Sequence, residues 1–229
     1  LDIENIGLRE RELELIKAFI NMPNGIVLVT GPTGSGKTTT LYAALNKANQ
    51  ICDKLITNED PVEYNLDGII QVQINEDVGM TYSKSLRAIL RQDPDKILVG
   101  EIRDKETAQI AIEASLTGHV VFTTLHTNDA PSAVARMIDI GCEPFLIAAT
   151  LEAVIAQRLV RRVCTKCKVW FSPTEEQLMA INLRPADVAG KKFAYGEGCN
   201  NCNGTGYRGR CAIFEIMMGT ERIKDGIMD

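Results

Sequence analysis

Long apolar runs, aromatic residues and an excess of basic charge are all scarce in this chain of 229 residues. No uninterrupted apolar segment approaches the roughly 20 residues of a membrane-spanning helix, and the first residues lack the basic-then-apolar pattern of a signal peptide. A formal net charge of −5 argues against a broadly basic surface, so no nucleic-acid partner is expected. We therefore interpret the chain as a cytoplasmic globular protein.

Seven cysteines are present, but their spacing does not favour a disulfide framework. Four of them form two C-x-x-C pairs, which suit a metal ion in a reducing compartment. The other three, Cys52, Cys142 and Cys211, are interpreted as small apolar residues. A hydrophobic content of 45% is sufficient for one substantial core with a small appended subdomain.

The most informative segment is GPTGSGKT at residues 31–38, which fits the pattern G-x-x-x-x-G-K-[ST]. The apolar run at residues 25–30 predicts a buried parallel strand before it, and residues 39–45 predict a helix after it. The loop glycines let backbone N–H groups approach phosphates, while the helix N-terminus, a lysine and a hydroxyl-bound Mg²⁺ offset the negative charge. The segment predicts nucleotide binding, with Thr38 as the magnesium ligand. The expected nucleotide-binding residues are Gly31, Pro32, Thr33, Gly34, Ser35, Gly36, Lys37, Thr38 and Thr39.

Alternating strand and helix patterns indicate an α/β fold with a largely parallel sheet that is covered on both faces. Further strands are predicted at residues 54–57, 69–74, 97–100 and 120–124. Helices are predicted at residues 8–22, 82–91, 105–116, 129–141 and 145–160. Beyond residue 161, cysteines, prolines and a glycine-rich stretch predict a loop-rich subdomain. We expect a core at residues 1–160, a cysteine-rich subdomain at 161–210, and a strand and helix at 211–229.

The apolar strand predicted at residues 97–100 is followed by a carboxylate, Glu101. Ligands of open α/β sheets bind at the carboxyl ends of strands, where an acid can lie beside Mg²⁺ and the attacking water. Glu101 is therefore a candidate for orienting or deprotonating that water. The alternative is a solvated acid at a strand end, which any α/β protein can have.

A second acidic segment, EDPVE, follows another predicted strand and contains Glu59, Asp60 and Glu63. These acids are a further source of carboxylates near a metal ion or water. The alternative is a turn built on Asp-Pro with exposed charge.

Both histidines lie around the strand predicted at residues 120–124. His126, just past its end, is a candidate sensor of the γ-phosphate, whereas His119, before its start, favours a structural role. Arg87, Arg91 and Arg103 could stabilise phosphate charge, either within the subunit or across a subunit interface. Surface salt bridges are the alternative for these arginines.

The two C-x-x-C pairs, Cys164 with Cys167 and Cys199 with Cys202, can supply four thiolates to a tetrahedral Zn²⁺. With no histidine close by, the expected site is a closed structural one that holds together a subdomain too small to fold on apolar burial alone. The alternatives are a redox C-x-x-C or free thiols.

Six segments occur in the order GPTGSGKTTTLY, EDPVEY, LRQDPDKILVGEIRD, TGHVVFTTLHTNDA, AQRLVRRVC and TGYRGRCAIFEIM. Together they resemble the secretion ATPases of the type II secretion and type IV pilus assembly group, over residues 1–218. The resemblance implies a RecA-like P-loop ATPase core with a small zinc-binding tetracysteine subdomain. It matches residues 31–38 to the Walker A loop, and it matches the metal cysteines to the extension enzymes rather than the retraction enzymes.

Further roles come from the same resemblance. It places Glu59, Asp60 and Glu63 in the aspartate box, Glu101 at the end of Walker B, and His119 and His126 in the histidine box. It implies a homohexamer that works with an inner-membrane platform protein, attached peripherally to the cytoplasmic face of that membrane through partners. It also implies that the N-terminal domains of the family are absent from this chain and that its C-terminal helix is truncated.

The first interpretation is therefore an ATP-hydrolysing motor subunit for type IV pilus assembly or type II protein secretion, of which the isolated fragment has little or no activity. One alternative is a related motor for DNA uptake or conjugation, which DNA-stimulated hydrolysis would favour. Another is a zinc-ribbon interaction module that binds nucleotide without turning it over.

Overall fold

The structure is a computed structural model that describes residues 2–228. Residue 1 of the predicted core and residue 229 of the predicted C-terminal segment lie outside the described residues. The chain divides into two compact units, Leu1–Leu159 with Ala212–Asp229 and Val160–Cys211. We call the first the core unit and the second the tetracysteine unit.

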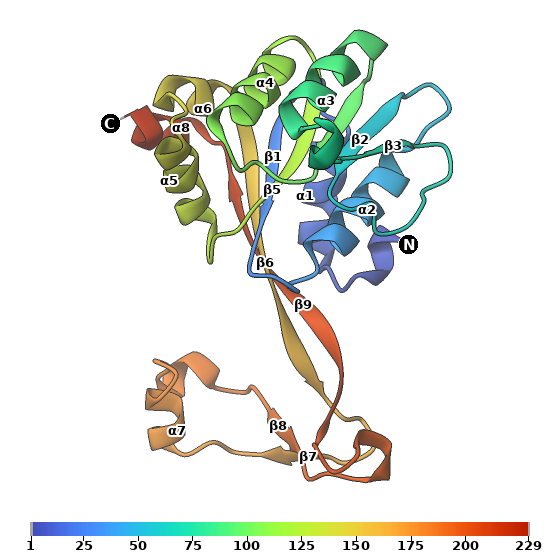
Figure 1. Cartoon of the computed structure of the whole chain (residues 1–229). Helices are drawn as coiled ribbons and strands as arrows, with labels where there is room; N and C mark the ends of the chain where they lie inside the picture. Colours follow the sequence, from blue (N-terminus) through green and yellow to red (C-terminus); the bar gives the residue numbers. More distant parts are fainter. Residues whose placement is uncertain (1, 229) are drawn as a thin grey trace. The chain divides into compact units, whose positions relative to one another are not determined.

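A seven-stranded sheet forms the centre of the core unit, with the strand order β3-β2-β4-β5-β1-β6-β9 (Figure 1). Its strands pair in parallel from β3 through to β6. This arrangement confirms the predicted α/β class with a mostly parallel sheet. The strands are β1 (Gly25–Thr30), β2 (Leu55–Glu59), β3 (Ile70–Gln73), β4 (Lys96–Val99), β5 (Val120–Leu125), β6 (Leu151–Val163) and β9 (Tyr207–Met218).

Helices cover both faces of this sheet, because alternate side chains of each buried strand point to opposite faces. In β1, Ile26 and Leu28 join the apolar cluster under α3 to α6, whereas Val27 and Val29 join the cluster under α1 and α2. The helices are α1 (Glu10–Ile20), α2 (Lys37–Ala48), α3 (Tyr82–Ile89), α4 (Lys105–Leu116), α5 (Ala130–Ile140), α6 (Pro144–Thr150) and α8 (Glu221–Met228). Short 3₁₀ helices are η1 (Ile3–Asn5), η2 (Glu76–Val78), η3 (Leu90–Gln92), η4 (Pro185–Val188) and η5 (Asn200–Cys202).

The helix predicted at residues 145–160 is wrong. Helix α6 ends at Thr150, and the chain continues directly as β6, which pairs in parallel with β1 from Leu151 to Ala156. A short apolar run has no periodicity that separates a buried strand from a buried helix. Pairing with the central strand β1 decided the outcome, because it satisfies the backbone groups of a segment that is buried from Ala153 to Gln157.

The tetracysteine unit contains the two-stranded antiparallel sheet of β7 (Lys168–Phe171) and β8 (Phe193–Gly196), and the short helix α7 (Glu175–Met179). Strand β6 begins in the core unit and ends in this unit, whereas β9 begins in this unit and ends in the core unit. Among the helices described between residues 2 and 228, none has both the length and the apolar character needed to cross a bilayer.

Candidate functional site

Four parallel strands bring the predicted site residues to one edge of the sheet. The glycine loop follows β1, Asp60 follows β2, Glu101 comes shortly after β4, and His126 follows β5 directly. Because the carboxyl ends of parallel strands lie on the same side, segments far apart in the sequence meet there.

The glycine loop is shaped by close contacts that exclude side chains. At Gly31, a Cβ atom would lie 2.3 Å from the carbonyl oxygen of Gln157 and 2.6 Å from the hydroxyl of Ser35. Gly36 caps the N-terminus of α2 with a φ of 90°, a conformation that L side chains rarely adopt. The hydroxyl of Ser35 is buried without a hydrogen-bond partner in the described structure. An unpaired buried hydroxyl and a free helix N-terminus fit a loop that binds an anion.

Lys37, the first residue of α2, donates from Nζ to the carbonyl oxygen of Gly31 at 2.7 Å and to Nδ1 of His126 at 3.4 Å. An ammonium group can only donate, so Nδ1 of His126 accepts and Nε2 carries the ring hydrogen. Nε2 lies 3.3 Å from Oε1 of Glu101. Burial lowers the pKa of Lys37, and the charge of the Glu101 carboxylate opposes that shift.

The second carboxylate oxygen of Glu101 is held by Arg103, whose Nε donates to Oε2 at 2.7 Å. This hydrogen bond raises the pKa of Arg103. Arg103 also lies 3.9 Å from Asp60, so the charged groups form the continuous series Lys37, His126, Glu101, Arg103 and Asp60. Arg103 lies between the two anionic side chains, Glu101 and Asp60, and its positive charge lowers their mutual repulsion.

Hydrogen bonds between neighbouring loops fix this series in place. The hydroxyl of Thr124 donates to the carbonyl oxygen of Gly100 at 2.7 Å, which joins the ends of β4 and β5 beside Glu101. The backbone N–H of Thr127 donates to the hydroxyl of Thr30 at 2.9 Å, which ties the segment after His126 to the end of β1.

Glu59 lies in a different environment from Glu101, since its side chain is buried. Its carboxylate accepts hydrogen bonds from the hydroxyls of Tyr42 and Thr57 and from the side-chain amide of Gln71. The backbone N–H of Glu63 donates to the Tyr42 hydroxyl at 3.3 Å, so the acidic segment is anchored on the same residue.

The other predicted site residues differ in their exposure and in their contacts. Thr38 is half-buried and Thr39 exposed in the first turn of α2. Arg87 forms an exposed ion pair with Glu106, and among the described contacts neither Arg87 nor Arg91 joins the charged series. His119 contacts the carbonyl oxygen of Ala114 through Nδ1 at 2.8 Å, a contact that fits a structural role.

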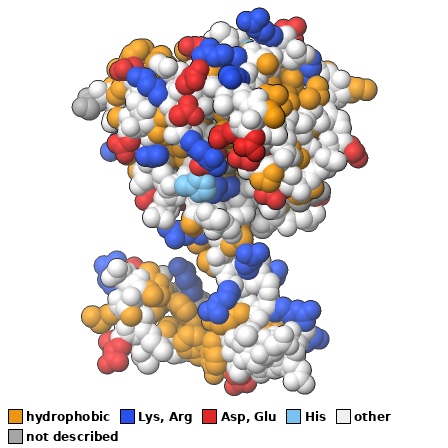
Figure 2. Space-filling view, in the orientation of Figure 1, with side chains coloured by type: hydrophobic (Ala, Val, Ile, Leu, Met, Phe, Trp, Pro, Cys, Tyr) orange, Lys and Arg blue, Asp and Glu red, His pale blue; other side chains and the backbone are white. Residues whose placement is uncertain are grey.

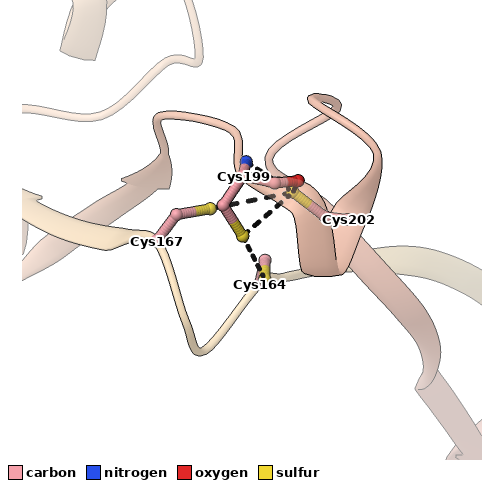
Figure 3. Close-up of side chains that lie close together, drawn as sticks. All are labelled: Cys164, Cys167, Cys199 and Cys202. Carbon is pink, nitrogen blue, oxygen red and sulfur yellow. Dashed lines mark hydrogen bonds between the residues drawn. The ribbon is translucent and has the colours of Figure 1, made fainter.

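The four cysteines of the two C-x-x-C pairs converge in the tetracysteine unit (Figure 3). All four sulfur atoms lie within 4.8 Å of one another, and the closest pairs are 3.8 to 3.9 Å apart. A tetrahedral ion with metal–sulfur bonds of about 2.3 Å requires sulfur–sulfur separations of about 3.8 Å. The cysteines are free thiols rather than disulfides, so the cluster fits a metal ion.

Nearby donors orient the sulfur atoms of this cluster. The side-chain amide of Asn201 donates to Sγ of Cys164 at 3.3 Å and lowers the pKa of that thiol to about 6. Backbone N–H groups of Cys199 and Gly206 donate to Sγ of Cys202 at 3.2 and 3.3 Å. Burial raises the pKa of Cys167 to about 12, and a bound cation would offset the cost of its ionisation.

The sequence analysis missed three polar residues near the loop and the acidic segment, of which Gln157 and Tyr42 are buried and Gln71 is half-buried. Gln157 accepts a hydrogen bond from the Thr40 hydroxyl at 2.7 Å, and its amide nitrogen lies 2.9 Å from where a Cβ of Gly36 would be. Tyr42 and Gln71 both contact Glu59. The only signal in the sequence was a polar residue inside an apolar run. For Gln157 this signal was missed, because residues 145–160 were wrongly predicted to form a helix.

A glycine loop between β1 and α2, with a strand-end acid on β4 and a mostly parallel sheet, defines the P-loop class of nucleotide-binding α/β proteins. Within that class, the chain belongs to the family described as type II/IV secretion system protein, whose model matches residues 1–229. This result confirms the family resemblance.

Two curated relatives illustrate the similarity. The chain is 50% identical over 227 residues to type II secretion system protein E of Dickeya dadantii, covering 99% of this chain and 45% of that protein. It is 48% identical over 230 residues to type IV pilus assembly ATPase PilB of Myxococcus xanthus, covering 100% of this chain and 41% of that protein. The chain thus spans less than half the length of these relatives.

Two solved structures share the fold. The pilus retraction motor PilT with bound ADP matches with a TM-score of 0.70 and 29% identity, over 100% of this chain and 56% of that one. The ATPase DotB of Legionella pneumophila matches with a TM-score of 0.68 and 26% identity, over 98% of this chain and 52% of that one.

Proposed function

We propose that this chain is the ATP-hydrolysing part of a motor subunit for type IV pilus assembly or type II protein secretion. The observation that carries the proposal is the hydrogen-bonded series from Lys37 through His126 to Glu101, beside the glycine loop at the carboxyl edge of the sheet. The names of the curated relatives support the choice of machine.

ATP would bind with its phosphates against residues 31–39, and Mg²⁺ would be held by the Thr38 hydroxyl with carboxylates of the acidic segment. Asp60 and Glu63 are the proposed contributors from that segment. The bound ion would supply positive charge that stabilises the transferring phosphoryl group. The unpaired Ser35 hydroxyl and the crowded Gly31 are features of this chain that fit such a ligand.

Lys37, Glu101 and His126 of the charged series have proposed roles in catalysis. The ammonium group of Lys37 stabilises the developing phosphate charge. Glu101 accepts a proton from the attacking water, with Glu59 as a second carboxylate that assists. His126 contacts both Lys37 and Glu101, so it can relay the loss of the γ-phosphate from one to the other. Arg87 and Arg91 are proposed to act on phosphate charge, including across a subunit interface.

The four cysteines are proposed to hold one Zn²⁺ as a closed structural site, because thiolates would fill every position of a tetrahedral ion. The full-length protein is proposed to form a homohexamer. It would act with an inner-membrane platform protein at the cytoplasmic face of the membrane, attached through that partner. The acidic net charge of the chain supports a protein partner rather than a nucleic acid.

The test is steady-state ATP hydrolysis by the full-length protein with Mg²⁺, compared with its Glu101→Gln variant. We expect the variant to bind ATP and to lose hydrolysis. The matched control is Glu113→Gln, which makes the same change at an exposed position of α4 and is expected to leave turnover unchanged. Atomic emission is expected to find about one zinc ion per chain.

Three results would contradict parts of this proposal. Normal turnover by Glu101→Gln would exclude Glu101 as the residue that activates water. No turnover by a hexameric full-length protein would instead favour a nucleotide-binding interaction module. Hydrolysis that depends on added DNA would favour a DNA-uptake or conjugation motor.

A further inference from the structure

The carboxylate of Glu59 is enclosed by protein donors, with only 4% of the residue exposed. Oε2 accepts from the hydroxyl of Tyr42, and Oε1 accepts from the hydroxyl of Thr57 and from Nε2 of Gln71 at 3.2 Å. Three donors on one carboxylate restrict its orientation far more than solvent would. The position of the Glu59 carboxylate is therefore fixed by these three donors.

Gln71 differs from the other donors, because it also holds the segment that follows β2. Its Oε1 accepts from the backbone N–H of Leu66 at 2.7 Å, and its Nε2 lies 3.3 Å from the carbonyl oxygen of Tyr64. The donor at Leu66 requires the amide oxygen on that side, so the amide nitrogen must face Glu59. A single side chain thus joins Glu59 to the segment at residues 60–69.

Tyr42 completes the connection from α2, the helix that begins at the glycine loop. Burial and the hydrogen bond to Glu59 raise the pKa of Tyr42, so its hydroxyl stays protonated and donates. The Tyr42 ring packs edge-to-face against Tyr64, with the ring centroids 4.8 Å apart. The segment at residues 60–69 is therefore held against α2 and β3 by the same residues that hold Glu59.

We infer that Gln71 is a positioning residue for hydrolysis, which orients the Glu59 carboxylate and makes its orientation depend on the position of residues 60–69. This inference rests on the proposed function, in which Glu59 assists water activation. A displacement of the segment removes the Gln71 amide from Glu59, because Leu66 and Glu59 share that one amide group. Glu59 therefore keeps all three of its donors only when the segment is in place.

The first test is the pair Gln71→Leu and Gln73→Leu in the full-length protein. Both positions lie on β3, but the Gln73 side chain is exposed. For Gln71→Leu we expect kcat for ATP hydrolysis to fall by about 10- to 100-fold with KM nearly unchanged, because a misplaced catalytic group affects the transition state rather than nucleotide binding. Gln73→Leu is expected to keep both constants.

A second variant separates the positioning of Glu59 from simple anchoring of the segment. Gln71→Glu keeps the side-chain length and an oxygen that accepts from the N–H of Leu66, but it replaces the donor to Glu59 with a second carboxylate. We expect kcat to fall at least as far as in Gln71→Leu. If Gln71 served only to anchor the segment, Gln71→Glu would have the kcat of the unmodified protein. That outcome would overturn the inference.

A double-mutant comparison completes the experiment. If Gln71 acts through Glu59, the variant that combines Glu59→Gln and Gln71→Leu has the same kcat as Glu59→Gln alone. Additive losses of kcat would overturn the inference. These outcomes are distinct from failure of the proposed function, which would show as absent hydrolysis by the unmodified protein.

Discussion

The two units of this protein are stabilised by different means. The core unit buries two apolar clusters, one on each face of its sheet. In the tetracysteine unit, the apolar residues found buried between residues 160 and 211 are Cys164, Leu178 and Cys202. Two of these three are cysteines of the sulfur cluster, so burial and the metal site coincide. The contrast indicates that the core unit is held by apolar burial, whereas the small unit buries little apolar surface and would gain its stability from the proposed metal ion.

The units also differ in charge. Residues 160–211 contain nine Lys and Arg against four Asp and Glu, although the whole chain has a net charge of −5. Basic and hydrophobic side chains are visible on the surface of this unit in Figure 2. Trp170 of this unit is exposed, and the ammonium group of Lys168 lies 3.8 Å from the centroid of its ring.

The largest expected effect in this comparison is the loss of the metal site through Cys199→Ser. A structural zinc site in a small domain contributes an apparent binding free energy of about 10–16 kcal/mol, and three thiolates cannot complete the tetrahedron. We expect the metal content to fall and limited proteolysis to cut within residues 160–211, while nucleotide affinity is retained. Cys52→Ser, at an exposed cysteine, is the control. Full metal content in Cys199→Ser would contradict the proposal that the tetracysteine unit is stabilised by a metal ion bound to these cysteines.

The reverse experiment destabilises the core unit alone. Leu28 in β1 is fully buried, so Leu28→Ala is expected to lower the free energy of unfolding by about 2–5 kcal/mol. Urea unfolding measures this loss, and metal analysis of the folded variant is expected to give the same stoichiometry as the unmodified protein. Ile51→Ala is the control, because Ile51 is exposed. Metal loss in Leu28→Ala would show that the two units do not fold independently.

A third prediction places the chemistry in the core unit. Lys37→Ala is expected to lower kcat/KM for ATP hydrolysis by about 10²- to 10³-fold, as the removal of a transition-state donor does, with unchanged metal content. Lys47→Ala, on the same helix, removes an exposed ion pair with Glu4 and is expected to leave kcat/KM unchanged. Equal losses in both variants would point to damage of α2 instead of a role for Lys37.

The smallest expected effect concerns the N-terminus of α5. Asp129 caps this helix by accepting from the N–H of Ser132 at 2.8 Å, and hydrogen bonds with the side chain and the backbone of Ser132 lower the pKa of Asp129. A carboxyl group whose pKa is lowered in the folded state stabilises the protein at pH values above its ordinary pKa. This contribution is lost as the pH falls through the lowered pKa. Asp129→Asn keeps a capping oxygen without a titrating group. The difference in melting temperature between the two proteins is therefore expected to shrink between pH 7 and pH 3.

Much of the fold could be predicted because local patterns and tertiary structure agree. The run at residues 25–30 is a strand over those same residues, and Asp129 and Gly141 delimit α5 as their capping preferences predict. Residues 151–160 were wrongly predicted as helical, because their apolar residues suit a helix or a strand and their partner β1 is more than a hundred residues earlier in the chain. Pairing between distant segments has no local signal.

The sequence by itself determined the glycine loop, the two cysteine pairs and the acids at the strand ends, because their chemistry depends on spacing within a few residues. Only the tertiary structure decided how these pieces meet. It placed His126 between Lys37 and Glu101, and it enclosed Glu59 among donors from α2, β2 and β3. Those contacts join residues of separate strands and helices, so they exist only once the parallel sheet has aligned the strand ends.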